Sequence, residues 1–595
     1  MCGIIAITGK DSNKISDGAI KSMLAALSRR GPDDHDFVRL NSETSSSNCV
    51  LGQTRLSIVD LSGGHQPMKD NRNPYTIVFN GEIYGYKDLR KELESRGHKF
   101  STNSDTEVVL KAYSEFGREC LKHLDGMFAF ALWDERKNEL FIARDRFGKK
   151  PFYYTFQDGM FTAASEIKAL FASGLIKGKI DPQAIDDFLR LLYIPPNKSV
   201  YSNIKVLLPA HAAIIKKGKI ETWRYWNLEK TEIKTTYAEA KAEIKRLFEK
   251  SCEKRMIADV EIGSLLSGGV DSTLVTAYAA KYSDKPIKTF SVKYGDLINE
   301  LLFAKQASEK IGTDHYSLNA DATDLTELKN VVAYFDEPHA DSSDFPQHLV
   351  SKLAASKVKV ALSGDGADEL FMGYGWYQKY WHTPRYKLDR IFGNPFSTYK
   401  KVTEVFSRSE RRRLLKTGQP VSIGPDEFEN EILTGYSDDF DKINRCDLLI
   451  YLPGQLLTKV DRTSMMHSLE MRTPFLDTAL AEFVYNLPTE LKLIRNENKS
   501  ILKEILGEIM PAEFVNRRKQ GFGAPIKEWL QEETITNELD RLIRTENHPM
   551  YRYLNREQVK KIIEAKSDLN KSSVQKIWSL LCLGIWFELN QKNFE

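Results

Sequence analysis

The spacing of apolar residues changes character at about residue 237, and this change points to a fold of at least two domains. Before it, short apolar runs separated by turn residues are typical of strands in antiparallel sheets. After it, strand-like runs alternate with helical periodicity, the pattern of βαβ units and a parallel sheet. The length of 595 residues supports the same division, because a single hydrophobic core stops growing at about 250–300 residues.

The first part, to about residue 215, is predicted to be an antiparallel α+β layer structure. The predicted strands are residues 3–8, 49–59, 75–84, 127–133, 139–143 and 151–154. Helical periodicity covers residues 20–28, 86–96 and 106–115. The polar segment 216–233 is the expected boundary between the two parts.

In the second part, three strands are predicted at residues 260–266, 287–292 and 358–362, each followed by a helix, at 272–282, at 300–311 and near 368. The loops after these strands should meet at one sheet edge, where ligands of open α/β folds bind. Beyond about residue 385 the chain is predicted to be mostly helical, with a packed helix at 573–589.

Composition argues against several classes of partner. The net charge is only +3, so no strong field favours nucleic acid or an anionic membrane, and the basic runs 408–416 and 517–519 are interpreted as solvated surface. No apolar run approaches the roughly 20 residues that span a bilayer. Six well-separated cysteines, without a CxxC pair or a signal peptide, favour a reducing, cytoplasmic location.

Cys2 follows the initiator methionine directly. Removal of Met1 would place a thiol and a free α-amine on one residue, and that amine can act as the base for a cysteine nucleophile. The alternative is that Cys2 is a small apolar residue at the start of a strand.

Three further features fit hydrolysis of an amide substrate. Asn80 and Gly81 offer a side-chain amide and an unobstructed N–H for an oxyanion, although Asn-Gly is also a common hairpin turn. Arg55 and Asp105 offer a cation and an anion for the two charged groups of an amino acid. Either could instead be an ordinary surface charge.

Five motifs in order resemble the class II glutamine amidotransferase domain: MCGI at 1–4, RRGPD at 29–33, RLSIVD at 55–60, NGEIY at 80–84 and RDRFG at 144–148. The resemblance implies that Cys2 is the nucleophile and that Asn80 and Gly81 form the oxyanion hole. It implies as glutamine contacts Arg55, Leu56, Ser57, Ile58, Val59, Asn80, Gly81, Glu82 and Asp105.

The segment SGGVDS at 267–272 lies between a predicted strand and a helix. Its glycines let backbone N–H groups approach phosphate oxygens at a helix N-terminus. The chain has no GxxxxGK[ST] motif, so this cradle lacks the Walker lysine. The structural alternative is a glycine turn in which Asp271 or Ser272 caps the helix, and such capping is expected in any case.

A second loop, SGDGADE at 363–369, brings three carboxylates to the same predicted sheet edge. Carboxylates beside phosphates suit Mg²⁺, although acidic loops are often merely exposed caps. The two loops resemble those of N-type ATP pyrophosphatases, which split ATP between the α- and β-phosphates.

The motifs LTKVDR at 457–462, EMRTPFLD at 470–477 and RKQGF at 518–522 extend the resemblance to the asparagine synthetase family over about residues 2–530. The family implies an N-terminal Ntn-type antiparallel sandwich, with layers α/β/β/α, at 2–215. It implies a parallel-sheet α/β ATP pyrophosphatase domain, of the adenine nucleotide α-hydrolase-like kind, at 237–530. Residues 531–595 are then a helical extension of the second domain.

The resemblance also implies roles for residues of the second domain. Lys459 would neutralise phosphate charge, although pairing with Asp461 is its structural alternative, and Asp365 would assist formation of an acyl-adenylate. Asp271 and Asp365 are the expected Mg²⁺ ligands. The expected ATP contacts are Leu265, Ser267, Gly268, Gly269, Asp271, Ser272, Val292, Ser363 and Gly364.

The family's reaction converts glutamine, aspartate and ATP to asparagine through β-aspartyl-AMP, and the resemblance suggests a homodimer. One alternative keeps this chemistry but uses another carboxylate, such as a sugar acid of surface polysaccharides, because the motifs do not define the acceptor pocket. A catalytically inactive regulatory protein would be expected to have lost Cys2, Asn80, Asp105, Asp271 or Asp365, and all five are present. The intact ATP loop argues against a glutaminase acting alone.

Overall fold

The computed structural model describes residues 2–594 apart from 10–11, 42–47, 232, 295–299, 321–324, 378–387, 389–394, 422–426, 437, 495–496, 518–522 and 566–569. The predicted motif at 518–522 therefore lies outside the described residues. Within the described part, no helix combines the length and the apolarity needed to cross a membrane.

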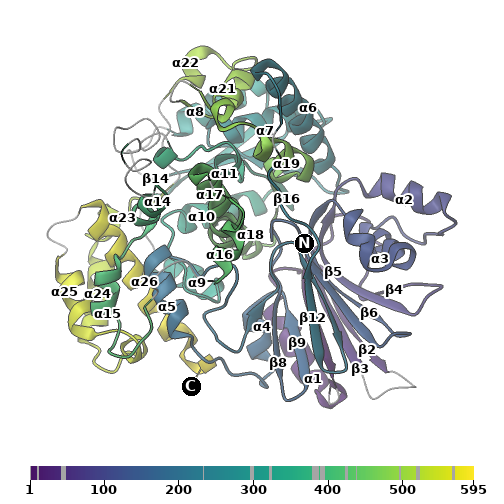
Figure 1. Ribbon diagram of the computed structural model, residues 1–595, viewed down its shortest axis with the longest axis horizontal. Helices are drawn as coiled ribbons and strands as arrows, with labels where there is room; N and C mark the ends of the chain where they lie inside the picture. Colours follow the sequence, from purple (N-terminus) through teal and green to yellow (C-terminus); the bar gives the residue numbers. More distant parts are fainter. Residues whose placement is uncertain are drawn as a thin grey trace.

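Two six-stranded antiparallel sheets form the N-terminal part of the molecule (Figure 1). The first contains, in spatial order, β10 (Lys205–Val206), β8 (Tyr153–Gln157), β9 (Met160–Ala164), β1 (Cys2–Gly9), β3 (Asn48–Arg55) and β2 (Asp34–Asn41). The second contains β12 (Lys219–Arg224), β11 (His211–Lys216), β7 (Glu139–Arg144), β6 (Gly126–Asp134), β5 (Tyr75–Ile83) and β4 (Met68–Lys69). β12 lies within the segment in which the sequence predicts the domain boundary.

Alternation along the strands explains why the sheets stack. On β1, Ile4 and Ala6 face the core between the sheets, whereas Ile5 and Ile7 face the helices on the outer side. Val78 on β5 enters the same inter-sheet core. Each sheet therefore has two apolar faces, and both are covered.

Helices cover the two outer faces and give the layer order α/β/β/α, which confirms the predicted sandwich. α1 and α4 pack together, with α1 against β1 and β3, while α2 and α3 pack together, with α3 against β5. Ser16 and Ser104 start α1 and α3 by accepting backbone hydrogen bonds at the N-cap. The helical elements are η1 (Ser12–Lys14), α1 (Asp17–Ala26), α2 (Tyr86–Ser95), α3 (Asp105–Phe116), η2 (Gly117–Lys122), α4 (Ile167–Ala172) and α5 (Pro182–Leu191).

The second part is built on a five-stranded sheet in which every pair is parallel, as predicted. Its order is β15 (Asp314–Ala320), β14 (Lys288–Tyr294), β13 (Ile262–Leu265), β16 (Val360–Leu362) and β17 (Glu470–Arg472). A capping box between Thr236 and Glu239 starts the first helix of this part. The helices are α6 (Tyr237–Arg255), α7 (Val270–Ala280), α8 (Glu300–Ile311), α9 (Leu325–Tyr334), α10 (Asp344–Ala355) and α11 (Ala367–Leu370).

The remainder is mostly helical, as predicted, and its last helices gather on one side of the molecule with α5 and α15 (Figure 1). Before β17 come α14 (Pro395–Thr403), α15 (Arg408–Leu414), α16 (Glu427–Leu433), α17 (Asp439–Cys446), the π-helix η3 (Asp447–Leu456) and α18 (Leu457–Met465). After it come η4 (Pro474–Leu476), α19 (Thr478–Asn486), α20 (Thr489–Lys492), the hairpin β18 (Leu493–Ile494) and β19 (Glu497–Asn498), α21 (Ser500–Leu506), α22 (Ala512–Val515), α23 (Ile526–Trp529), α24 (Glu533–Arg544), η5 (Pro549–Arg552), α25 (Arg556–Glu564) and α26 (Lys571–Phe594).

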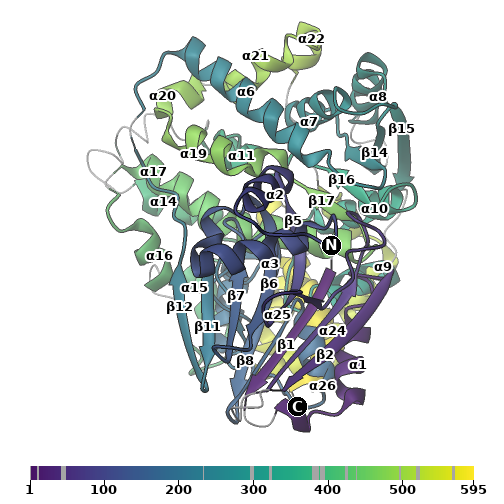
Figure 2. The same cartoon turned by 90° about the vertical axis from the view of Figure 1, so that its right-hand side faces the viewer.

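The N-terminal end of the chain lies where the two parts meet, near β16 in both views and near β17 in Figure 2 (Figures 1 and 2). Polar contacts across this junction are buried. Lys149 Nζ donates to the carbonyl oxygen of Leu476 at 2.8 Å, and Arg30 pairs with Asp461 at 2.7 Å. These contacts fix the N-terminal part against the second part.

Candidate active sites

Cys2 and Asn80 lie side by side, although 78 residues separate them in sequence. The backbone N–H of Cys2 donates to Asn80 Oδ1 at 3.0 Å. Asn80 is fully buried, and its Nδ2 has no hydrogen-bond partner in the part of the chain that the structure describes. A buried donor without a partner is costly, and here it is available beside the thiol-bearing residue for an oxyanion.

Asn80 and Gly81 lie within β5, where they pair with Ala129 and Phe128 of β6. The strand continues to Ile83, so the Asn-Gly pair is not the hairpin turn that the sequence left open. Gly81 is required by packing, because a Cβ atom there would lie 2.1 Å from the carbonyl oxygen of Met127. The register of β5 against β6 therefore fixes the position of the Asn80 side-chain amide.

The Arg55 side chain organises the segment that follows β3. Its guanidinium donates to the carbonyl oxygens of Val59 at 3.2 Å and Asp60 at 2.6 Å. These contacts fold residues 56–59 into a loop, and β3 therefore ends at Arg55 rather than at the predicted residue 59. In the β1–β3 register Arg55 is opposite Cys2, which brings the expected glutamine-binding loop to the thiol.

Asp105, at the start of α3, accepts a hydrogen bond from the N–H of Ile83 at 3.0 Å. Burial raises the pKa of this carboxyl to about 6. The neighbouring Glu82 carboxylate accepts from Arg472 of β17 at 3.3 Å, across the junction of the two parts. The Glu82 side chain is thus engaged with the second part of the chain, and its glutamine contact stays a prediction.

Cys2 as a whole residue is 7% exposed. Burial raises its pKa, against the opposing effects of a hydrogen bond from the Leu56 backbone and of the Arg55 charge. A thiol with a raised pKa needs a base to become a nucleophile.

All nine predicted ATP contacts line one cavity of about 1770 Å³ at the carboxyl edge of the parallel sheet. The loops after β13 and β16 touch there, since a Cβ on Gly364 would lie 2.9 Å from Asp271 Cβ. The lining includes Leu265, Ser267, Gly268, Gly269, Asp271, Ser272, Val292, Ser363 and Gly364, together with Asp365 and Lys459.

The glycine loop leaves the start of α7 without a side-chain cap. Its N-cap is Gly269, which makes no side-chain hydrogen bond, so the predicted capping by Asp271 or Ser272 is wrong. The Ser272 hydroxyl instead accepts from the N–H of Ser267 at 3.2 Å and closes the loop. The helix N-terminus, with its partial positive charge, is therefore available to an anion.

Lys459, on α18, is 5% exposed and lines the cavity. Its Nζ donates to Ser343 Oγ at 2.7 Å and lies 3.5 Å from Asp341 Oδ2. Burial by itself would lower the pKa of Lys459, but Asp341 and Asp365 outweigh it and raise the pKa. Lys459 does not pair with Asp461, whose carboxylate is bound by Arg30, so that alternative is wrong.

Asp365 lies beside Lys459 in the same cavity. Its carboxylate accepts a hydrogen bond from Ser363 Oγ at 2.7 Å. Burial raises the pKa of Asp365, and the charge of Lys459 opposes that rise.

Comparison with known proteins shows the same two halves. A sequence profile of the glutamine amidotransferase domain matches residues 1–226, and one of asparagine synthase matches residues 243–589. Asparagine synthetase [glutamine-hydrolyzing] 3 of Bacillus subtilis is 32% identical, over 99% of this chain and 98% of its own length. The chain belongs to the asparagine synthetase family.

Two further relatives carry similar names. Asparagine synthetase [glutamine-hydrolyzing] 1 of Bacillus subtilis is 31% identical, over 99% of this chain and 97% of its own length. A putative asparagine synthetase [glutamine-hydrolyzing] of Mycobacterium bovis is 32% identical over 89% of this chain and 88% of its own.

Three residues that line the cavity of this family member were not predicted from the sequence to belong to a site. Lys499 Nζ lies 2.6 Å from both Asp271 and Asp368, and Arg517 donates to the carbonyl oxygen of Gly268. Gln347 lines the cavity, and its Nε2 has no partner among the described residues. No local motif marks them as site residues, because each reaches the site from a distant segment. The interpretation of the basic run 517–519 as solvated surface is wrong for Arg517, which is half-buried against the glycine loop.

Asp271, one of the two residues expected to hold Mg²⁺, has a carboxylate oxygen that could bind a cation. Asp271 Oδ2 pairs with Lys499, while Asp271 Oδ1 is buried without a hydrogen-bond partner in the described chain. Mg²⁺ is commonly held by one or two carboxylates together with substrate phosphates. The described residues contain no cluster of three or more His, Cys, Asp or Glu side chains that could hold a metal.

Replacing Gly268 with alanine is expected to lower the free energy of unfolding by about 2–4 kcal/mol and to weaken ATP binding. Gly268 has φ +71°, and a Cβ would lie 2.6 Å from the backbone carbon of Phe303. Thermal unfolding and ATP–pyrophosphate exchange measure the two effects.

The matched control is Gly269→Ala, whose Cβ would meet nothing closer than Ser267 Oγ at 3.3 Å. This variant should keep most of the stability. If the two variants have the same stability and the same exchange activity, the loop does not require the positive φ angle and close packing of Gly268.

Proposed function

We propose that the chain is a glutamine-dependent asparagine synthetase. Cys2 hydrolyses glutamine, ammonia passes within the protein, and ATP activates the side-chain carboxylate of aspartate as β-aspartyl-AMP with release of pyrophosphate. Ammonia then displaces AMP to give asparagine. The observation that carries the proposal is that one chain builds both centres, a buried thiol beside a free amide donor and a cation-lined phosphate cavity.

In the first half-reaction, the Cys2 thiolate attacks the side-chain amide carbon of glutamine. The base is its own α-amine, freed by removal of Met1, and the neighbouring Asn80 Oδ1 would orient that amine. The oxyanion takes hydrogen bonds from Asn80 Nδ2 and the N–H of Gly81. Expulsion of ammonia leaves a thioester, which water hydrolyses to glutamate and free thiol.

Glutamine is held by its two charged α-groups. Arg55, with the loop of residues 56–59 that it organises, is proposed to face the α-carboxylate, and Asp105 the α-ammonium group. An ammonium group beside Asp105 would favour the ionised carboxyl and offset the effect of burial.

In the second half-reaction, an aspartate carboxylate oxygen attacks the α-phosphorus of ATP and pyrophosphate leaves. The loop 267–272 cradles the phosphates, and Lys459, Lys499 and Arg517 surround them with positive charge. Mg²⁺, held by Asp271 and Asp365 with the phosphates, would supply charge neutralisation when bound. Exclusion of water between the centres keeps ammonia unprotonated and nucleophilic.

The decisive experiment is acceptor-dependent release of pyrophosphate from ATP, measured with aspartate, other amino acids and sugar acids. Release that depends on aspartate, with asparagine as product, is expected. Release of pyrophosphate only with another acid would support the same two half-reactions with that acid, in place of aspartate, as the acceptor. No release with any acid would overturn the proposal.

We also propose a cytosolic location, in keeping with six cysteines that are all free and buried.

Glutamine binding should weaken as the pH falls below about 6, because Asp105, with a pKa of about 6, then becomes neutral and no longer holds the ammonium group. The dissociation constant should rise about tenfold per pH unit below that pKa. Calorimetric titration of the Cys2→Ala variant measures binding without turnover.

Protonation of Asp105 does not itself destabilise the folded protein. The folded pKa of Asp105 lies above the ordinary value of 3.8, so this group adds stability at low pH and loses it as the pH rises through about 6. Asp105→Asn is the control and should bind glutamine weakly at every pH. A pH dependence that persists in Asp105→Asn would assign the titration to another group.

A further inference from the structure

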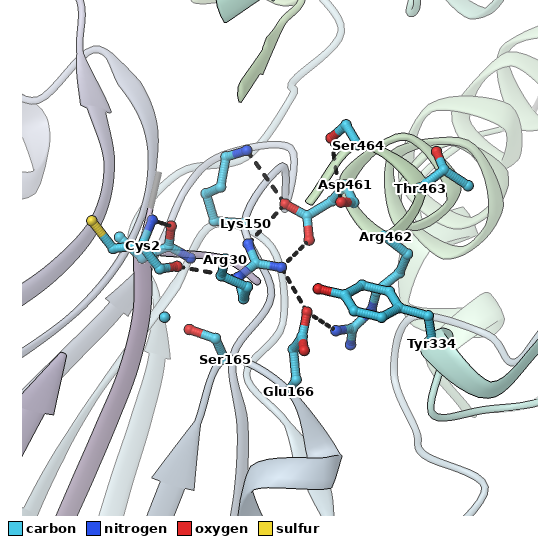
Figure 3. Close-up of polar contacts among 12 residues, drawn as sticks. Cys2, Arg30, Lys150, Ser165, Glu166, Tyr334, Asp461, Arg462, Thr463 and Ser464 are labelled. Carbon is cyan, nitrogen blue, oxygen red and sulfur yellow. Dashed lines mark hydrogen bonds and ion pairs between the residues drawn. The ribbon is translucent and has the colours of Figure 1, made fainter. Parts of the chain in front are cut away.

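Arg30 is a fully buried guanidinium between the N-terminal sheet and α18 (Figure 3). Its Nε donates to the carbonyl oxygen of Cys2 at 3.1 Å. Its two terminal nitrogens donate to the two carboxylate oxygens of Asp461, one to each, at 2.7 and 3.0 Å. One side chain therefore joins the main chain of Cys2 to a carboxylate from the other half of the molecule.

Further buried charges hold the side chains of Arg30 and Asp461 in place. Glu166 accepts from Arg30 at 2.9 Å and lies 2.8 Å from Arg462, the residue after Asp461 (Figure 3). Lys150 Nζ lies 3.4 Å from Asp461 Oδ1. Burial alone would raise the pKa of Asp461, but Arg30 and Lys150 outweigh it and lower the pKa, so this carboxylate stays charged.

The same helix, α18, carries Lys459 into the nucleotide cavity and Asp461 toward Arg30. Residues two apart on a helix are about 200° apart around its axis, so the two side chains leave opposite sides of α18. A shift of α18 when Lys459 binds phosphate would therefore move Asp461, Arg30 and the Cys2 carbonyl together. Tightly packed, paired charges transmit such shifts because they cannot deform separately.

We propose that Asp461 is a positioning residue for the Cys2 centre, acting from the second half of the chain through Arg30, and that it couples glutamine hydrolysis to occupancy of the nucleotide cavity. The proposal rests on the proposed function of the two centres. It assigns to Asp461 no contact with glutamine or ATP.

The test is Asp461→Asn in the full-length protein, which keeps the shape but removes the charge that holds Arg30. We expect kcat/KM for glutamine to fall about 10- to 100-fold, the range that small misplacement of a reacting group produces. In the wild-type protein we expect ATP and aspartate to stimulate glutamine hydrolysis. In Asp461→Asn this stimulation should disappear, and glutamate formed per asparagine should rise. Synthesis driven by ammonia should stay within about twofold of wild type, because Lys459 and the ATP loops are untouched.

Lys149→Met is the matched control, because Lys149 makes a buried contact across the same junction without touching Cys2. It should lower the melting temperature and leave the ratio of glutamate to asparagine unchanged. Asp461→Glu, which keeps the charge, should restore part of the stimulation. A double-mutant cycle with Arg30→Lys should be non-additive if the pair acts as one unit.

Unchanged glutamine kinetics and stimulation in Asp461→Asn, with stability lowered as in Lys149→Met, would overturn the proposal. An equal loss of ammonia-driven synthesis would also overturn it, because Asp461 would then serve the nucleotide site. If Asp461→Asn does not fold, Asp461→Glu and Arg30→Lys provide the same comparison. Aspartate-dependent pyrophosphate release by the wild-type protein tests the proposed function separately.

Discussion

Replacing Cys2 with alanine is expected to lower glutamine-driven asparagine synthesis by at least about a thousandfold, the scale of loss when an enzyme nucleophile is removed. The Asn80 amide that would hold the oxyanion remains, but nothing forms the thioester. Ammonia-driven synthesis should survive, because the nucleotide cavity is built from other segments of the chain. Asparagine formed from each nitrogen source is the measurement.

Cys49→Ala is the control, because Cys49 is another fully buried free thiol in the same sheet. It should keep both activities. Loss of both activities in Cys2→Ala would contradict the division of labour between the two centres. Mass spectrometry of the active protein should find Met1 removed, and a retained methionine would exclude the α-amine of Cys2 as the base.

Replacing Lys459 with methionine should lower pyrophosphate release about 100- to 1,000-fold with either nitrogen source, comparable to removing one preorganised donor from a site of developing charge. Methionine keeps much of the side-chain length but leaves Asp341 and Asp365 beside the phosphates without their cation. Hydrolysis of glutamine, measured without ATP, should continue. Cys2→Ala should therefore abolish glutamine hydrolysis and spare pyrophosphate release, whereas Lys459→Met should do the reverse.

Lys459→Arg should recover part of the activity, because it keeps the charge at the end of a differently shaped side chain. Lys281→Met provides the control, since Lys281 pairs with Glu249 at the exposed end of α7. Pyrophosphate release at the wild-type rate by Lys459→Met would remove Lys459 from the phosphate site.

Local pattern predicted most of the framework that carries the sites. The short apolar runs of β1 and β5 and the strand–loop–helix order around residues 267–272 are properties of neighbouring residues, and the structure confirms them. Boundaries were less certain. β3 stops at Arg55 because that side chain binds carbonyl groups of the next segment, a contact that apolar periodicity does not encode.

Long-range electrostatics accounts for what the sequence did not predict. Lys499 reaches Asp271 from 228 residues away, and a lone lysine carries no signal of such a contact. Pairing of Lys459 with Asp461 was the structural alternative, yet both lie on α18, where residues two apart do not face each other. The partner of Asp461 is Arg30, and only the tertiary fold brings the two together.

The π-helix η3 runs directly into α18, so its length sets the rotation of that helix. Loss or gain of one residue there would turn α18 by about 100° and carry Lys459 and Asp461 away from their partners at the same time. Every residue of this segment is buried or half-buried, and a Cβ on Gly454 would lie 2.8 Å from the Tyr193 ring, so packing constrains its composition as well as its length. In evolutionary terms, an insertion or deletion in this segment would be selected against by both centres at once, so both chemistries would have to be lost or kept together.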